Sequence, residues 1–190
     1  MRLPYVANPP PATSSPQNAA IIERIQQRRA PQPLQPLDLT LLHSPPLADG
    51  WNAFLGAVRT RTDLPADLRE LAISRVAVCN HAWYEWKHHA PLAAAAGVSK
   101  EALEVLVKQE GPLAGLDTPA QLDDRQWAVL VYTDEMTRNV QVRDETFARL
   151  KSLFSDREVV EITGTIAAYN CVSRFLVALD DSATISPPEH

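Results

Sequence analysis

At 190 residues the chain is long enough for a single domain with a full core, because a fold of about this size buries roughly 70% of the surface of its unfolded chain. Its formal net charge of -5 excludes the basic surface that binding to a phosphate backbone requires, so we expect no nucleic-acid partner. No apolar run approaches the roughly 18 to 20 residues that span a bilayer, and the N-terminus lacks the plan of a secretory signal. We therefore expect a cytoplasmic protein without a membrane partner.

The two cysteines, Cys79 and Cys171, are too few for a disulfide framework. Both lie in apolar stretches with helical spacing, where a lone cysteine usually behaves as a small hydrophobic residue. We expect both to be structural.

The N-terminal segment 1–50 holds 10 of the 16 prolines, and proline fixes φ and removes a hydrogen-bond donor. This composition predicts an extended Pro-rich arm rather than part of the core. The predicted organisation is thus an arm at 1–50, a helical domain at 51–182 and a C-terminal tail at 183–190.

Within this arm, Asn18 is a suitable cap for a short helix that ends at Arg29. Ile21, Ile22 and Ile25 follow at helical spacing, and such an apolar stripe predicts that the arm lies against the body or against a neighbouring subunit. The alternative is a loose, solvated leader.

Beyond residue 51 the apolar residues recur at three and four, which predicts helices and no strand. Pro65 and Asp67 favour the start of an amphipathic helix, Ser99 caps another, and Ser155 with Glu158 forms a capping box before a long last helix. Gly111 to Gln121 contains two prolines and two glycines and predicts a loop. The predicted helices span 66–79, 82–97 with a kink at Pro91, 99–111, 123–138, 142–154 and a long segment from 155. The fold class is all-α.

The segment 69–89 concentrates polar chemistry, with three of the five histidines and two of the four tryptophans. On a helix Glu85 and His89 are neighbours, because they are four residues apart. A carboxylate beside an imidazole is a usable pair for general acid or base catalysis, and Trp83 and Trp86 would exclude water and contact the substrate. The alternative is a structural hydrogen bond in a helix-packing interface, since structural networks mimic sites.

A metal site is a further alternative, because His81, Glu85 and His89 at four-residue spacing offer three ligands. In zinc hydrolases, however, the glutamate directly follows the first of two histidines four residues apart, and here it stands in the middle of the run. This order favours proton transfer, so we expect no metal and no cofactor.

Residues 68–71, Leu-Arg-Glu-Leu, followed by Tyr84-Glu85-Trp86-Lys87-His88-His89, Ala93 and Gly97, resemble the carboxymuconolactone decarboxylase and alkyl hydroperoxidase D-like superfamily. The resemblance covers Trp51 to Val107 well. It implies an alkyl hydroperoxidase D-like helical bundle and a homo-oligomer, either a trimer, a hexamer or a dimer, with the active site around the helix that carries the motif.

The peroxidase branch of this superfamily has a glutamate, eleven residues, a cysteine, two residues, a second cysteine, three residues and a histidine. Laid on this chain from Glu70, the cysteine positions fall on Ala82 and Glu85, and the histidine falls on His89. The dithiol couple that peroxide reduction uses is absent, and Cys79 lies three residues before the first thiol position. The chain therefore resembles the branch without the paired thiols.

By this resemblance the expected chemistry is a cofactor-free lyase or isomerase that acts on a lactone or keto acid. His89 would donate the proton, Glu85 would orient His89, and Glu70 and His81 would position the substrate. Arg75 would bind a substrate carboxylate, since guanidinium pairs with carboxylate bidentately, although a solvent-facing Arg75 fits the pattern equally well.

Two other interpretations stay open. One is a peroxidase of the alkyl hydroperoxidase D type that uses Cys79, and the other is a non-catalytic helical oligomer, because a shared fold does not fix function. A filled core around His89 would favour the second of these.

Overall fold

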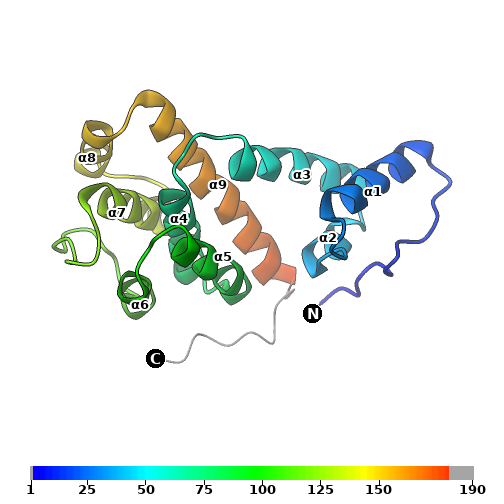
Figure 1. Ribbon diagram of the computed structural model, residues 1–190, viewed down its shortest axis with the longest axis horizontal. Helices are drawn as coiled ribbons and strands as arrows, with labels where there is room; N and C mark the ends of the chain where they lie inside the picture. Colours follow the sequence, from blue (N-terminus) through cyan, green and yellow to red (C-terminus); the bar gives the residue numbers. More distant parts are fainter. Residues whose placement is uncertain (1, 180–190) are drawn as a thin grey trace.

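The computed structural model describes residues 2–179, and within them the chain forms nine α-helices and no strand (Figure 1). The all-α prediction is therefore confirmed, whereas the predicted tail at 183–190 lies outside the described residues. The helices are α1 (Pro16–Arg29), α2 (Pro36–Leu41), α3 (Pro45–Thr60), α4 (Ala66–Cys79), α5 (Trp83–Ala95), α6 (Lys100–Lys108), α7 (Asp124–Asn139), α8 (Asp144–Leu153) and α9 (Asp156–Leu179).

The helix ends follow local capping chemistry. Ser99 accepts a hydrogen bond from the backbone N–H of Ala102 at the start of α6, and Asp123 forms a capping box with Gln126 at the start of α7. Ser155 and Glu158 exchange the predicted hydrogen bonds before α9. Because these signals depend only on nearby residues, the helix boundaries beyond residue 65 were predictable within a few positions.

The extended Pro-rich arm is not confirmed, because three helices occupy most of the first 60 residues. Pro16, Pro36 and Pro45 stand at the first position of α1, α2 and α3, where no intrahelical donor is needed and a fixed φ favours the helix. The prolines thus begin helices rather than prevent them. As a result α2 was not expected, and α3 crosses the predicted boundary at residue 50.

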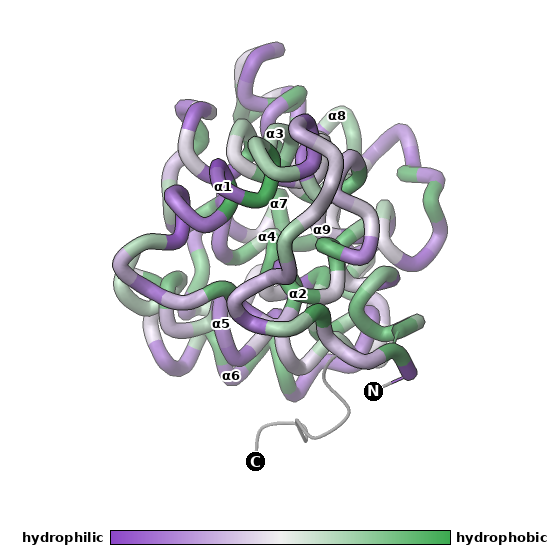
Figure 2. The backbone as a smooth tube through the Cα atoms, turned by 90° about the vertical axis from the view of Figure 1, so that its right-hand side faces the viewer, coloured by the Kyte–Doolittle hydropathy of each residue, from purple (hydrophilic) through white to green (hydrophobic). Residues whose placement is uncertain are grey.

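The first helix lies against the body, as its isoleucine stripe predicts. In Figure 2 the chain along α1 is mostly hydrophilic, and of its residues only Ile21 and Ile25 are buried. Ser15, rather than Asn18, caps this helix. The isoleucines join a small core cluster that also contains Leu34, Leu41, Leu42 and Ala48 and that Trp51 and Phe175 border.

Helix α4 lies at the centre of the fold, next to α5, α7 and α9 (Figure 1). It was predicted as amphipathic, but ten of its 14 residues are buried, because neighbouring helices cover it on almost every side. The polar side chains of Glu70, Ser74 and Arg75 are therefore inside the protein. A buried polar group without a partner is costly, so the partners of these three residues decide where chemistry can occur.

The last helix, α9, runs between the α1–α3 group and the α4–α8 group (Figure 1). Among the described residues it alone is long and apolar enough to cross a membrane by length and composition, with a mean hydropathy of 1.3 over an 18-residue window, so the expectation that no apolar run approaches this length was wrong. Its residues Ile162, Ile166 and Tyr169 are buried in the main core cluster with parts of α4 and α7. In this fold α9 is a core helix.

Candidate active site

A buried hydrogen bond between Glu70 and His89 joins α4 to α5. Glu70 Oε2 lies 2.7 Å from His89 Nδ1, and the two residues are 4% and 6% exposed. Arg69 Nε donates a second hydrogen bond to the other oxygen of Glu70, at 3.2 Å. Glu70 and His89 are thus held together between α4, which is buried on almost every side, and the buried face of α5.

The protonation states of this pair follow from its surroundings. Burial alone would raise the pKa of Glu70, but the hydrogen bonds and charges of His89 and Arg69 lower that pKa below its ordinary value, so the carboxylate is ionised at neutral pH. Burial lowers the pKa of His89, and Glu70 opposes this effect only in part. At neutral pH the imidazole is therefore neutral, and its Nδ1–H donates to the carboxylate, which can only accept. This tautomer leaves a lone pair on Nε2 for proton transfer.

Tyr169 on α9 also contacts the site. Its ring meets the His89 ring edge-on, with the ring centroids 4.9 Å apart. Burial raises the pKa of Tyr169, and the charges of Glu70 and Glu85 raise it further, which places the phenol within electrostatic range of both carboxyl groups. Tyr169 was not among the predicted site residues.

Glu85 is not paired with His89, although both lie on the buried face of α5. The side chain is 2% exposed, and both carboxyl oxygens lack a hydrogen-bond partner among the described residues. Burial raises the pKa of Glu85 well above its ordinary value. The partner that orients His89 is Glu70 from the neighbouring helix, which spacing along one helix does not reveal.

His81 lies outside this cluster. It is exposed in the turn between α4 and α5, with a positive φ of 52°, and its ring lies edge-on to Trp83 at 5.9 Å. Helix α5 begins only at Trp83, so His81 does not extend the face that carries Glu85 and His89. Within residues 2–179 no group of three or more histidine, cysteine, aspartate or glutamate side chains is arranged to hold a metal ion.

The two tryptophans of the segment are half-buried. Trp86 packs against the core cluster of α6 and α7, which includes Leu106 and Trp127. Neither Trp83 nor Trp86 has a ring contact with His89 within the described residues. Their predicted contact with a substrate remains a prediction.

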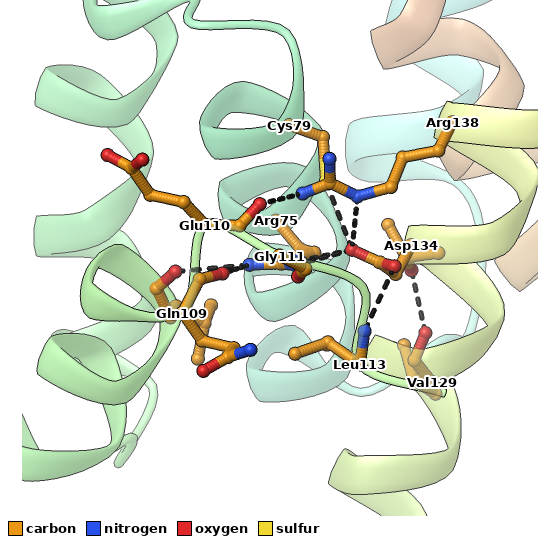
Figure 3. A network of polar contacts seen from close by, with 11 residues as sticks. Arg75, Cys79, Gln109, Glu110, Gly111, Leu113, Val129, Asp134 and Arg138 are labelled. Carbon is orange, nitrogen blue, oxygen red and sulfur yellow. Dashed lines mark hydrogen bonds and ion pairs between the residues drawn. The ribbon is translucent and has the colours of Figure 1, made fainter. Parts of the chain in front are cut away.

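Arg75 belongs to a separate buried network (Figure 3). Its Nε and Nη2 both donate to Asp134 Oδ1, and its remaining N–H groups donate to the backbone carbonyls of Leu106, Gln109 and Gly111. All five donors of the guanidinium are therefore used inside the protein. In this arrangement Arg75 fastens α4 to α7 and to the start of the loop after α6, and it has no donor left for a substrate carboxylate.

Cys79 lies at the edge of the same network (Figure 3). Its Sγ donates to Asp134 Oδ1 at 3.4 Å, and burial raises the pKa of this thiol to about 11. A thiol with this pKa is almost wholly protonated at neutral pH, whereas the thiolate is the reactive nucleophile. Cys171, the second cysteine, is exposed on α9.

A cavity of about 210 Å³ lies away from His89, between α7, α8 and the loop that precedes α7. Its wall includes Trp127, Val131, Thr146 and Arg149. None of the predicted site residues lines this cavity.

Comparisons with known proteins agree with the fold. Residues 45–122 match the model of the carboxymuconolactone decarboxylase family. No curated protein sequence matches the chain. This match spans α3 to the loop after α6 and therefore includes Glu70, Glu85 and His89.

Several solved structures share the fold. A protein of unknown function from Agrobacterium tumefaciens, described as an antioxidant defence protein AhpD, is 22% identical with a TM-score of 0.63, over 73% of this chain and 90% of that chain. The debrominase Bmp8 is 17% identical with a TM-score of 0.67, over 90% and 88%. An uncharacterised peroxidase-related protein from Silicibacter sp. TM1040 is 19% identical with a TM-score of 0.67, over 93% and 90%. At these identities the likeness shows the fold alone.

Proposed function

We propose that this chain, of which residues 45–122 match the model of the carboxymuconolactone decarboxylase family, is a cofactor-free lyase or isomerase that acts on a lactone or keto acid. The observation that carries this proposal is the buried contact of 2.7 Å between Glu70 and His89. His89 moves the proton, and Glu70 holds its ring in one tautomer and one orientation.

The environment of His89 favours proton transfer. Its lowered pKa makes the neutral ring available as a base at neutral pH, and it makes the imidazolium a stronger acid once formed. Isomerisation begins with removal of a proton from the carbon next to a carbonyl, and decarboxylation ends with delivery of a proton to that carbon. The same Nε2 serves either direction.

The geometry gives less support to thiol chemistry. The thiol of Cys79 is hydrogen-bonded to Asp134, and its pKa is about 11, so it supplies almost no thiolate at neutral pH. A second candidate function is a non-catalytic helical oligomer. It is favoured by the position of the 210 Å³ cavity, which lies at α7 and α8 rather than at His89.

A thermal-shift screen tests the proposal with carboxylated lactones, 3-oxo acids and organic peroxides as ligands. A ligand at about 100 times its dissociation constant adds roughly 2.7 kcal/mol of stability. We expect a lactone or oxo acid to stabilise the wild type and His88→Ala more than His89→Ala. His88 is a matched control, because it is exposed and its ring contacts the carbonyl and the ring of Tyr84 on its own helix.

Any compound that stabilises proteins with His89 more than His89→Ala then enters a turnover assay for loss of carbon dioxide or movement of a double bond. Equal stabilisation of the wild type and His89→Ala, or no stabilisation by any lactone or oxo acid, would favour the non-catalytic oligomer. Peroxide turnover that is lost in Cys79→Ser would favour the thiol peroxidase.

A further inference from the structure

Three buried side-chain atoms lack a hydrogen-bond partner among the described residues, and all three lie on α4 and α5. They are Ser74 Oγ and the two carboxyl oxygens of Glu85. A buried polar group without a partner is destabilising, so most proteins leave few of them. Their concentration in one pair of helices points to a site that binds a polar group.

The positions of Ser74 and Glu85 follow from the contact between Glu70 and His89. Helices α4 and α5 are joined by a short turn at residues 80–82. They are also in contact further from this turn, at Glu70 and His89, so the two helices are antiparallel. Ser74 is one turn from Glu70 toward this connection, and Glu85 is one turn from His89 toward it. Ser74 and Glu85 therefore face each other across the helix pair, one level below Glu70 and His89.

Tyr169 links the two levels. Its ring contacts His89, and negative charge on Glu70 or on Glu85 would raise the pKa of its phenol, so both carboxyl groups lie near Tyr169. The unpartnered oxygens of Glu85 therefore belong to the same region as the imidazole.

We propose that Ser74 and Glu85 form an oxygen-binding subsite that holds the carbonyl oxygen of the substrate while His89 exchanges a proton with the adjacent carbon. This inference deepens the proposed function and rests on it. It assigns Glu85 a role in contact with the substrate, in place of the predicted role of orienting His89.

The proposed subsite supplies donors, because the Glu85 carboxyl group stays protonated. No cation is paired with it in the part of the chain that the structure describes, and burial raises its pKa. A neutral carboxylic acid has one O–H donor, and the serine hydroxyl has another. Two donors at a carbonyl oxygen stabilise the negative charge that develops there.

Decarboxylation of a 3-oxo acid at this subsite needs no cofactor. The bond between the carboxylate carbon and the α-carbon breaks, carbon dioxide leaves, and the electron pair forms an enolate whose oxygen accepts hydrogen bonds from Glu85 and Ser74. Neutral His89 takes a proton from solvent, and the resulting imidazolium delivers a proton to the α-carbon, which returns His89 to its neutral form. In isomerisation the first proton moves the opposite way, from the α-carbon to neutral His89.

Two readouts on acetoacetate test the subsite separately from His89. The first is the infrared band of the keto carbonyl in [3-¹³C]acetoacetate, which moves to lower frequency when its oxygen accepts a hydrogen bond. The second is protein-dependent deuterium exchange at the α-carbon in D₂O, above the rate in buffer alone. We compare the wild type with Ser74→Ala, Glu85→Leu, His89→Ala and the control His88→Ala.

We expect wild type and His88→Ala to shift the carbonyl band, and Ser74→Ala and Glu85→Leu, each of which removes one donor, to reduce this shift. Loss of one donor should also slow the exchange by about 10²- to 10³-fold. His89→Ala should keep the band shift and lose the exchange. Because Ser74→Ala and Glu85→Leu replace buried polar atoms that have no partner among the described residues with apolar ones, both variants should fold, and a thermal melt checks this.

An unshifted band in the wild type, or a shift that survives in both Ser74→Ala and Glu85→Leu, would overturn the subsite. Exchange that depends on His89 without such a shift would leave the proposed function standing and the subsite refuted. A shift that depends on Ser74 and Glu85, with no exchange that depends on His89, would support the subsite and contradict the proposed proton transfer.

Discussion

Glu70 and His89 lie 19 positions apart in the chain, yet Glu70 Oε2 is 2.7 Å from His89 Nδ1. An ionised carboxylate can only accept, so this contact fixes the proton of the neutral imidazole on Nδ1 and the lone pair on Nε2. The tautomer of His89 is thus set by a residue of the neighbouring helix, and it can be tested directly.

Glu70→Gln should slow any reaction that depends on His89 by on the order of 10²- to 10⁴-fold, the usual contribution of a positioned acid or base. The amide of glutamine can donate to Nδ1, which would move the imidazole proton to Nε2. Initial rates measure the first effect, and ¹⁵N NMR of the imidazole measures the second. Arg69→Gln is the control, because Arg69 donates to Glu70 Oε1 and to the Leu64 carbonyl rather than to the oxygen that His89 contacts, so its loss should leave the tautomer unchanged. An unchanged tautomer and rate in Glu70→Gln would contradict the assignment.

The same pair should make the protein less stable in acid. The pKa of His89 is lowered from its ordinary value of 6.5 in the folded state, so its contribution to stability is present above pH 6.5 and is lost as the pH falls through the lowered pKa. The pKa of Glu70 is lowered from 4.5, so it adds a second loss at still lower pH.

We therefore expect the difference in free energy of unfolding between wild type and His89→Gln to shrink as the pH falls below 6.5. Urea unfolding at several pH values from 8 to 4 measures this difference, and His88→Gln, which alters an exposed ring, should show no such trend. A difference that stays constant or grows in acid would show that burial does not lower the pKa of His89.

Most of the fold was predictable because its signals are local. The capping residues Ser99, Asp123 and Ser155 mark helix starts in the sequence as they do in the structure. Prolines were harder to interpret, since the same residue that breaks a helix interior begins a helix at its first position, as Pro36 and Pro45 do here.

The site was predictable only in part, because it depends on which helices surround α4. Spacing within one helix pairs Glu85 with His89, whereas the structure pairs His89 with Glu70 across the hairpin. The family pattern already contains the Glu70 and His89 positions, and this signal favours the observed pair. Ser74 and Tyr169 carried no signal of their own, since a serine and a tyrosine within apolar helices usually serve packing.

Asp134 should be essential for stability, because it is the only carboxylate partner of the fully buried Arg75 in the described network. It also accepts hydrogen bonds from Arg138, Cys79 and the backbone of Leu113. Asp134→Asn leaves a buried guanidinium without a counter-charge and should cost about 3–5 kcal/mol in urea unfolding. Asp124→Asn, which breaks an exposed ion pair with Arg149, should cost about 0–1 kcal/mol. Equal losses in the two variants would show that the network is not stabilising.

Cys79 should be unreactive at neutral pH. With a pKa of about 11, about one thiol in ten thousand is ionised at pH 7. In a Cys171→Ser background the rate of alkylation by iodoacetamide should be low and should rise steeply with pH up to about 11. Cys79→Ser, which keeps the exposed Cys171, is the comparison and should react faster at pH 7. Rapid alkylation of Cys79 at neutral pH would instead support the thiol peroxidase.

Glu85 should lower the stability of the folded protein as the pH rises. Its pKa is raised in the folded state above the ordinary value of 4.5, so its contribution is fully present below pH 4.5 and is lost as the pH rises through the raised pKa. Glu85→Gln cannot ionise and avoids this loss. The variant should therefore melt at a higher temperature than the wild type at pH 8, and this difference should fade toward pH 4.5.

Glu104→Gln, at an exposed position of α6, is the control and should show no such dependence on pH. A wild type that gains stability over Glu85→Gln as the pH rises would mean that the carboxylate has a partner, and the donor that the oxygen-binding subsite requires would then be absent.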